Sequence, residues 1–366
     1  MGVRSRVLVA MSGGIDSSVA AALLHKQGHE VVGVAMRLAP DPPSSGVSRR
    51  GTCCSHDDFE DARRVAEQLG FPFYVVDLRN EFNASVIRNF VSEYLNGRTP
   101  NPCVICNREI KFDRLWQRAQ ALNADYIATG HYARIEGEHG AFFRLLRARD
   151  ESKDQSYFLF TLGQKEMART LFPLGSLTKC QVRALGRELG LPNADKPESQ
   201  EICFVPEGDY AGFVARHASS ESIRAGWIRD GCGNNLARHS GIHQFTVGQR
   251  RGLGIASTSP LYVRTIDAGT GDVTVVRRGD LVSAGLVATM VRLTRPELAR
   301  GEEILIEAKI RYRHPAIPAS LRILDGTRAE ILFRNGGPAV TPGQACVFYR
   351  DDEVLGGGII ETGLNA

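Results

Sequence analysis

Short apolar runs alternate with helical patterns along the first third of the chain. Four runs have the length and composition of buried strands: residues 6–10, 30–38, 72–78 and 124–129. Three intervening stretches repeat hydrophobic side chains at helical spacing: residues 57–69, 80–95 and 107–121. This alternation predicts an α/β fold, a doubly wound parallel sheet with helices on both faces. In such a sheet, ligands bind beyond the carboxyl ends of the strands.

The pattern changes after about residue 205. One more helix is expected over residues 207–217, and a short helix is expected earlier, over residues 157–162. The remainder is rich in glycine and contains short β-like runs: residues 273–276, 285–293, 304–310, 321–324, 329–333 and 345–349. We therefore expect three domains: an α/β domain over 1–206, a small linking domain over 207–284 and a C-terminal β-barrel over 285–366.

Composition excludes several classes of protein. Of the 366 residues, 43% are hydrophobic and 23% charged, which is ordinary for a globular protein. No apolar run is long enough to cross a bilayer, and the apolar stretch at residues 7–11 is too short for a signal peptide. We expect a cytoplasmic protein without a membrane partner. Residues 39–50, rich in Pro, Ser and Gly, are expected to form a surface loop.

A glycine-rich loop follows the first strand and precedes a helical pattern. It reads Ser-Gly-Gly-Ile-Asp-Ser-Ser over residues 12–18 and lacks both the lysine of a Walker A loop and the spacing of a dinucleotide fingerprint. Backbone N–H groups and serine hydroxyls at a helix N-terminus favour an anion. Asp16 would repel a phosphate unless it holds Mg²⁺ or caps the turn. The structural alternative is a tight turn with a serine N-cap.

This loop resembles the PP-loop of N-type ATP pyrophosphatases. Six further motifs strengthen the match: TPNPCVICNREIKF (99–112), ATGHY (128–132), KDQSY (153–157), SQEICF (199–204), GQRRGL (248–253) and IRYR (310–313). Together, in this order, they resemble the tRNA-specific 2-thiouridylase family, MnmA, from end to end. The resemblance implies ATP with Mg²⁺ as cofactors and tRNA as substrate. It places ATP on Ala10, Met11, Ser12, Gly13, Gly14, Ile15, Asp16, Ser17, Met36 and Gly130.

The chain has eight cysteines, and in a reducing compartment these are more often buried, catalytic or metal-binding than paired structurally. Cys103 and Cys106 form a Cys-x-x-Cys motif just ahead of the predicted 107–121 helix, where a helix N-terminus lowers a thiol pKa. The resemblance implies that Cys203 carries a persulfide and that Cys106 completes the sulfur transfer, which leaves a disulfide between the two residues. For the other five we expect packing or capping roles: Cys53, Cys54, Cys180, Cys232 and Cys346.

Cys103 departs from the family pattern, because well-known enterobacterial members have Asp at this position. Three cysteines, Cys103, Cys106 and Cys203, can therefore face the site. A Cys₃ set could hold an iron–sulfur cluster with one open iron, which is the alternative to the persulfide route. Cys-x-x-Cys by itself suits both redox and metal roles.

The resemblance also implies contacts to tRNA. Between residues 286 and 350 there are ten basic and six acidic residues, an excess of four that equals the whole chain's net charge of +4. A basic C-terminal module fits RNA binding. The residues expected at the target base or elsewhere on tRNA are Asn101, Pro102, Cys103, His131, Lys153, Asp154, Gln155, Arg311, Tyr312 and Gln344.

The predicted function is ATP-dependent tRNA 2-thiolation. The enzyme would adenylate C2 of the wobble uridine, U34, and replace its oxygen with persulfide sulfur supplied by a cysteine desulfurase or a sulfur-relay protein. One alternative is a PP-loop ligase or amidating enzyme that acts on a small molecule, with incidental cysteines. Another is an RNA-binding or redox-sensing protein that has lost catalysis, against which the intact loop at residues 12–18 argues.

Overall fold

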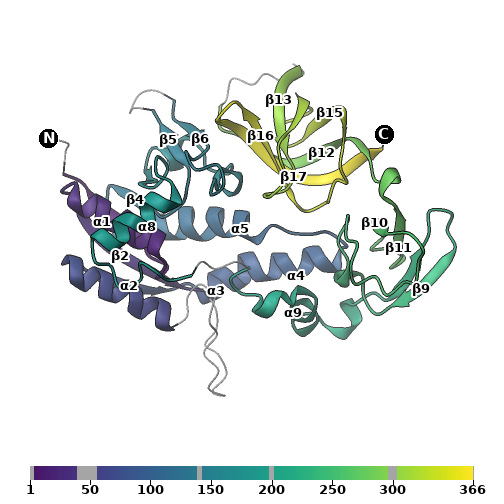
Figure 1. Ribbon diagram of the computed structural model, residues 1–366, viewed down its shortest axis with the longest axis horizontal. Helices are drawn as coiled ribbons and strands as arrows, with labels where there is room; N and C mark the ends of the chain where they lie inside the picture. The colour runs from purple at the N-terminus through teal and green to yellow at the C-terminus, as the bar shows by residue number, and fades with distance from the viewer. Residues whose placement is uncertain (1–3, 39–55, 138–141, 198–201, 296–302, 366) are drawn as a thin grey trace. The chain divides into compact units, whose positions relative to one another are not determined.

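The computed structural model describes residues 4–38, 56–137, 142–197, 202–295 and 303–365 (Figure 1). The predicted 39–50 loop, Cys53 and Cys54 lie outside these ranges. The chain forms two compact units, the first made of residues 1–86, 103–208 and 352–354, the second of residues 87–102, 209–351 and 355–366. Among the described residues, none builds a helix with the length and hydropathy that a bilayer crossing needs.

The first unit contains a parallel sheet. Its strands are β1 (Arg6–Ala10), β2 (Glu30–Arg37), β3 (Phe73–Asp77), β4 (Tyr126–Thr129) and β7 (Thr170–Leu171). They lie in the order β3-β2-β1-β4-β7, with all pairs parallel. Because β1 is central, its carboxyl end opens next to the ends of β2 and β4, where the glycine-rich loop begins.

Helices cover both faces of this sheet. Val7 and Val9 of β1 pack in one core with α1 (Ile15–Lys26), α2 (His56–Leu69) and α8 (Lys179–Glu188). Leu8, which alternates to the other face, is also fully buried, and α6 (Leu115–Ala121) contacts β4. The doubly wound prediction is confirmed: strands buried on two faces read as continuous apolar runs.

Two long helical segments contain π-helical turns. The first is α3 (Arg79–Phe82), η1 (Asn83–Ile87) and α4 (Arg88–Leu95), and the second is α5 (Pro102–Ile105), η2 (Cys106–Arg114) and α6. The second segment therefore begins five residues before the predicted start at Asn107. Asn101 followed by Pro102 explains this, since Asn suits the N-cap position and Pro the first helical position. Cys106 thus lies within the helix and not in a loop ahead of it.

The helix expected over residues 157–162 is absent from this described stretch. Only one 3₁₀ turn, η3 (Ser156–Phe158), forms there. The side chains of Tyr157, Leu159, Phe160 and Leu162 are all buried, which one face of a surface helix could not provide. The remaining elements of the first unit are β5 (Arg134–Glu136), β6 (Arg144–Leu146), α7 (Gln164–Met167) and η4 (Pro206–Gly208).

The linking part of the second unit is a four-stranded sheet with short helices. Its strands, in the order β10-β11-β8-β9, are β8 (Gly226–Arg229), β9 (Asn235–His239), β10 (Leu261–Ile266) and β11 (Val273–Arg277). The helices are α9 (Tyr210–His217), η5 (Ser220–Ser222), η6 (Ile242–Gln244) and η7 (Arg278–Asp280). The predicted 207–217 helix corresponds to α9, which contacts α4.

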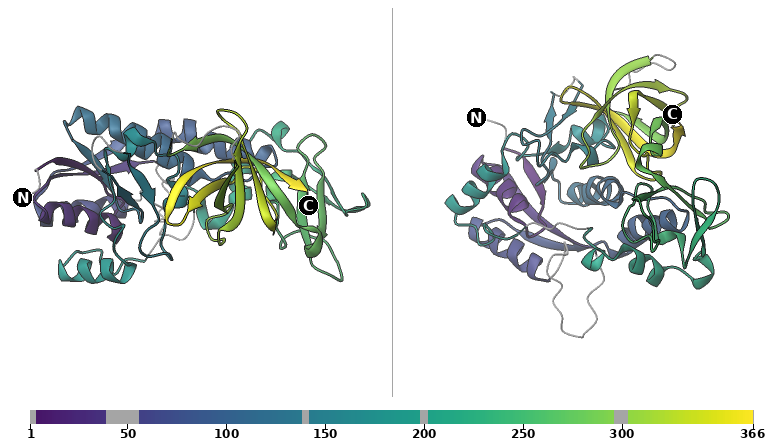
Figure 2. Two further views of the ribbon diagram at one scale, coloured as in Figure 1. Left: turned by 90° about the horizontal axis from the view of Figure 1, so that it is seen from above. Right: turned by 45° about the vertical axis from the view of Figure 1, so that its right-hand side comes forward.

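Six described strands close into the C-terminal barrel (Figure 2). They are β12 (Ser283–Leu293), β13 (Glu303–Lys309), β14 (Ile317–Ile323), β15 (Ala329–Gly337), β16 (Ala345–Arg350) and β17 (Glu353–Asn365). Pairing of β12 with β17 completes the ring, so the predicted barrel is confirmed. The long β17 was not predicted, because Gly356, Gly357 and Gly358 interrupt its apolar pattern.

Candidate nucleotide and cysteine site

The glycine-rich loop forms a tight cradle at the N-terminus of α1. The Ser17 hydroxyl donates to the Gly14 carbonyl at 3.0 Å and accepts from the Ser12 N–H at 3.1 Å. Gly13 has a φ of +73°, and a Cβ there would lie 2.2 Å from the Asp58 carbonyl oxygen. Only glycine fits this position. The loop therefore lies at the N-terminus of α1, where the helix dipole favours an anion. The Ser17 and Ser18 hydroxyls, which were expected to face that anion, donate to the Gly14 carbonyl instead.

Asp16 is engaged by two side chains from other elements. Lys179 Nζ lies 2.7 and 2.8 Å from its two carboxylate oxygens, and the Tyr132 hydroxyl donates to it at 2.8 Å. The Lys179 side chain is 10% exposed and that of Asp16 is 31% exposed, so water reaches the ion pair from the Asp16 side. Neither of the two roles expected for Asp16, Mg²⁺ ligand or turn cap, describes this arrangement. The lysine offsets a negative charge that would otherwise face a bound phosphate.

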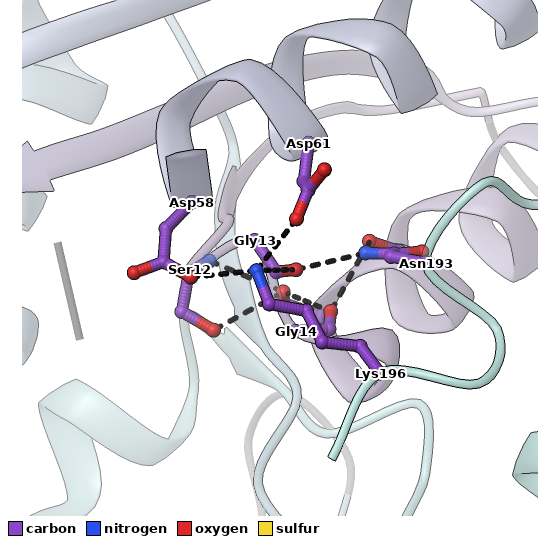
Figure 3. Close-up of polar contacts among 9 residues, drawn as sticks. Ser12, Gly13, Gly14, Asp58, Asp61, Asn193 and Lys196 are labelled. Atoms are coloured by element: carbon purple, nitrogen blue, oxygen red, sulfur yellow. Dashed lines mark hydrogen bonds and ion pairs between the residues drawn. The ribbon is translucent and has the colours of Figure 1, made fainter. Parts of the chain in front are cut away.

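Lys196 and Asn193 contact the loop at Gly13 (Figure 3). Lys196 Nζ lies 2.7 Å from Asp58 Oδ1, 2.6 Å from Asp61 Oδ2 and 3.4 Å from the Gly13 carbonyl oxygen. Asn193 Nδ2 donates to the Gly13 carbonyl and to the Ser18 hydroxyl, both at 2.9 Å. The backbone of the loop is thus tied both to α2 and to the segment that follows α8.

Gly130 and Met36 lie at the carboxyl ends of β4 and β2. A Cβ on Gly130 would lie 2.7 Å from the backbone nitrogen of Ser17. Gly130 therefore allows β4 to approach the first turn of α1 closely. The Met36 side chain is buried in β2.

The described carboxylates near the loop, Asp16, Asp58 and Asp61, do not form a preformed Mg²⁺ site. Asp16 is paired with Lys179, and Asp58 and Asp61 are paired with Lys196. Mg²⁺ in nucleotide sites is bound mainly by phosphate oxygens and water, with one or two carboxylates. The loop offers ATP phosphates the positive end of the α1 dipole, whereas these three carboxylates do not fit a metal in their present pairing.

Cys106 and Cys203 belong to segments that pack around the short helix α3. The Phe204 ring meets the Phe82 ring edge-on, with centroids 5.5 Å apart, and η2, which begins at Cys106, contacts α3. Both thiols are partly exposed, and Cys103 is exposed. The described residues include Cys103, Cys106 and Cys203. Among these described residues, no group of three or more His, Cys, Asp or Glu side chains is arranged to hold a metal.

Asn107, next to Cys106, anchors the π-helical turn. Its Nδ2 donates to the Phe158 carbonyl at 3.0 Å, and its side chain is 2% exposed. This contact fixes the start of η2 against the η3 turn. Of the cysteines expected to have packing or capping roles, Cys346 is buried in the barrel, where burial raises its pKa, whereas Cys180 and Cys232 are exposed and do not pack in a core.

His131 follows Gly130 and bridges two polar side chains. Its Nδ1 lies 2.7 Å from Thr129 Oγ1, and its Nε2 lies 3.4 Å from Lys111 Nζ. Burial, together with the Lys111 charge, holds the His131 pKa well below its ordinary value. A neutral imidazole that accepts from Lys111 at Nε2 must carry its proton on Nδ1, which then donates to Thr129.

Within the 153–155 segment, two of the three expected tRNA contacts are used internally. Asp154 is 5% exposed, and its carboxylate accepts from the Ala148 and Ser156 N–H groups and from the Ser156 hydroxyl. The Gln155 side-chain oxygen accepts from the Tyr132 N–H at 2.9 Å. Lys153 is partly exposed.

Cys103 lies in the first unit, and the second unit contains the remaining expected tRNA positions. Asn101 is partly exposed and precedes the helix that starts at the buried Pro102. The Arg311 guanidinium donates to the Ala339 carbonyl and to Thr341 Oγ1, and Lys309 Nζ lies 5.7 Å from the centre of the Tyr312 ring. Gln344 donates to two backbone carbonyls just before Asn101. Arg311 and Tyr312 lie in a turn after β13 and not on a strand.

Sequence reasoning missed the lysines that organise the loop. Lys196 lies seven residues before Cys203, in a polar stretch that leads into the SQEICF motif. Its position beside this motif is the signal by which the sequence could have marked it as a site residue. Lys179 is 163 residues from Asp16, and nothing local marks it as a partner. The structure places the loop residues 12–17 and Gly130 at the start of α1 and Met36 in β2, all in the first unit. The second unit contains five of the residues expected to contact tRNA: Asn101, Pro102, Arg311, Tyr312 and Gln344.

Comparison with known proteins agrees with the predicted resemblance. The family model described as "tRNA methyl transferase HUP domain" matches residues 5–207, "tRNA methyl transferase PRC-barrel domain" matches 211–277, and "Aminomethyltransferase beta-barrel domain" matches 283–360. The chain is 51% identical to a tRNA-specific 2-thiouridylase MnmA of Geobacter metallireducens over 364 residues, 99% of this chain and 98% of the relative. It is 52% identical to that of Geotalea uraniireducens, covering 99% and 96%, and 47% identical to that of Solibacter usitatus, covering 97% and 99%. At this identity over nearly the full length, the chain belongs to the tRNA-specific 2-thiouridylase (MnmA) family.

Proposed function

We propose that this protein is an ATP-dependent tRNA sulfurtransferase that converts the wobble uridine, U34, to 2-thiouridine. The observation that carries the proposal is the set of functional groups that the first unit contains. It combines an anion-binding loop at the N-terminus of α1 with two partly exposed thiols, Cys106 and Cys203, on segments that pack around α3. A nucleotide site and a thiol pair in one unit suit activation of an oxygen followed by its replacement with sulfur.

In the first step, the C2 oxygen of uridine attacks the α-phosphorus of ATP, and pyrophosphate leaves. The backbone donors between Ser12 and Ser17 would bind the phosphates, and Lys179 would keep Asp16 from opposing them. Mg²⁺ would arrive with ATP, held by phosphate oxygens and water, because the nearby carboxylates are already paired with lysines. The product is an adenylated uridine whose AMP is a far better leaving group than oxide.

In the second step, the terminal sulfur of a Cys203 persulfide bonds to C2. The Cys106 thiolate attacks the Cys203 sulfur, and the S–S bond to the transferred sulfur breaks. Its electron pair forms the thiocarbonyl as AMP leaves, and a Cys106–Cys203 disulfide remains. An external thiol must reduce this disulfide, and a cysteine desulfurase or relay protein must reload the persulfide. Both needs suit a reducing cytoplasm.

The cluster alternative has less support. An iron–sulfur cluster would need Cys103, Cys106 and Cys203 gathered as one ligand set, and these described residues form no such group. Cys103 is exposed in the first helical turn, next to the expected base-binding residues Asn101 and Pro102. We therefore propose that Cys103 borders the base pocket and is not a ligand.

Single-turnover thiolation of tRNA by anaerobically purified protein tests the proposal. We expect Cys106→Ala and Cys203→Ala to abolish thiolated product, with ATP-dependent adenylation retained. Cys180→Ala and Cys232→Ala, at exposed positions, serve as controls and should match the wild type. Loss in all of the Cys103, Cys106 and Cys203 variants, with stoichiometric iron in the wild type, would instead establish the cluster. Pyrophosphate exchange that depends on a metabolite and ignores tRNA would establish the ligase alternative.

A further inference from the structure

A turn of the C-terminal barrel binds the segment that leads to the expected base-binding residues. The turn, residues 339–344, joins β15 to β16 and is called the clamp turn below. The segment is residues 98–100, directly after α4 and its capping residues. Both belong to the second unit.

Three successive residues of the clamp turn engage Thr99 and Pro100. The Thr99 N–H donates to the Pro342 carbonyl at 2.8 Å. Gln344 Nε2 donates to the Thr99 carbonyl at 3.0 Å and to the Pro100 carbonyl at 3.1 Å. Pro100 has no backbone N–H, so its carbonyl is the only polar backbone group that it offers. One primary amide thus satisfies both carbonyls of this dipeptide.

Gly343 makes the close approach of the two segments sterically feasible. Its φ is +91°, and a Cβ there would lie 2.8 Å from the Thr99 carbonyl oxygen and 2.9 Å from the Thr99 nitrogen. Any larger residue would push Thr99 away from the turn. The Pro-Gly-Gln sequence over residues 342–344 therefore supplies an acceptor, a contact surface and a double donor in order.

The clamp turn is itself held by Arg311. The guanidinium donates to the Ala339 carbonyl at 2.9 Å and to Thr341 Oγ1 at 2.8 Å. Thr341, 2% exposed, donates in turn to the Val247 carbonyl at 3.3 Å. The Thr99 and Thr246 hydroxyls lie 3.2 Å apart. Arg311 and Gln344, two expected RNA contacts, are thus linked by one internal network that ends at Thr99 and Pro100.

We infer that Gln344 is a positioning residue, which acts on thiolation by fixing the backbone that carries Asn101 and Pro102. This inference rests on the proposed function, since it concerns how the target uridine is presented. Chain continuity gives the reason: displacement of Pro100 moves Asn101, and a misplacement of about 1 Å can lower a rate about 100-fold. A residue that contacts tRNA directly would contribute to affinity, whereas a positioning residue contributes to the rate with tRNA bound.

The test separates affinity from rate in Gln344→Glu and Gly343→Ala. Glutamate is similar in size but offers no donor and brings a charge toward two carbonyls. Alanine at 343 displaces Thr99 while leaving the Gln344 amide intact. For both variants we expect the single-turnover rate at saturating tRNA to fall by about 10- to 100-fold, with the Kd for tRNA within about threefold of wild type. Gln120→Glu, an exposed position on α6, controls for the charge change and should behave as wild type.

Hydrogen exchange of the peptide spanning residues 96–101 gives a second measurement that needs no activity. Exchange of the Thr99 amide, now bonded to Pro342, should accelerate in both variants while barrel strands stay protected. Unchanged exchange would overturn the inference, as would a weakened Kd with an unchanged saturated rate. Absence of thiolation by the wild type would refute the proposed function, while the exchange result would still decide the clamp.

Discussion

The Lys179 ammonium lies 2.7 Å from one carboxylate oxygen of Asp16 and 2.8 Å from the other. The pair joins the N-terminal end of α8 to the first turn of α1, next to the glycine-rich loop. A carboxylate at the helix end where we propose that ATP binds would be electrostatically unfavourable for its phosphates, and this lysine compensates the charge. The loop therefore depends on a residue that its own motif does not contain.

Replacement of Lys179 by Met should weaken ATP binding and the fold together. Asp16 would keep its charge without the ammonium, so we expect the Kd for ATP to rise at least tenfold and the free energy of unfolding to fall by about 1–3 kcal/mol. Isothermal titration and urea denaturation measure the two effects. The double variant Asp16→Asn/Lys179→Met should recover much of the stability, and ATP affinity equal to wild type in Lys179→Met would contradict the role assigned to the pair.

Lys196 should matter for the nucleotide, although it bonds mainly to carboxylates. Lys196→Gln leaves Asp58 and Asp61 facing each other beside Gly13, and we expect at least a tenfold loss of ATP affinity. The matched control is Arg187→Gln, which removes an exposed ion pair with Asp195 and should change stability by less than about 1 kcal/mol. Equal ATP binding by both variants would show that Lys196 does not hold the loop.

Gly130 should not tolerate a side chain. Gly130→Ala places a Cβ 2.7 Å from the Ser17 nitrogen, which forces β4 and the start of α1 apart. We expect a loss of about 1–3 kcal/mol in the free energy of unfolding and weaker ATP binding. Gly279→Ala is the control, because no atom lies within 4 Å of a Cβ at that position. A Gly130→Ala protein as stable as the control would contradict the predicted clash.

Two histidines should make the linking domain sensitive to acid. Burial lowers the pKa of His239, and its hydrogen bond to the Gly271 carbonyl partly opposes this shift. Burial also lowers the pKa of His243, and the nearby His239 lowers it further. The unfolded chain then binds more protons than the folded one below about pH 6.5, so stability is full above that pH and falls as the pH drops. The slope cannot exceed about 1.4 kcal/mol per pH unit for each histidine.

Urea denaturation at pH 7.5 and 5.5, followed by Trp227 fluorescence, measures this effect. His243→Gln should reduce the difference between the two pH values, since it removes one group that the fold keeps neutral. A wild-type protein that is equally stable at both values would refute the assignment.

The local pattern of apolar residues was the basis for most of the elements that were predicted correctly. The strands β1, β2, β3 and β4 were recognisable because residues buried on both faces form continuous apolar runs. The second helical segment begins five residues before its predicted start, because Asn101-Pro102 starts the helix without any apolar periodicity to mark it. The long β17 escaped detection because its glycines carry no hydrophobic signal.

The sequence by itself determined the chemistry available to the protein: the loop over residues 12–18, the Cys-x-x-Cys motif and each apolar strand are recognisable from neighbouring residues. Only the tertiary structure decided which groups act together. Asp16 and Lys179 are 163 residues apart, Asp58 and Lys196 are 138 apart, and Thr99 and Gln344 are 245 apart. Such pairs leave no periodic or local trace, because packing creates them when distant elements meet, and they set the charge at the loop and the backbone position at Asn101.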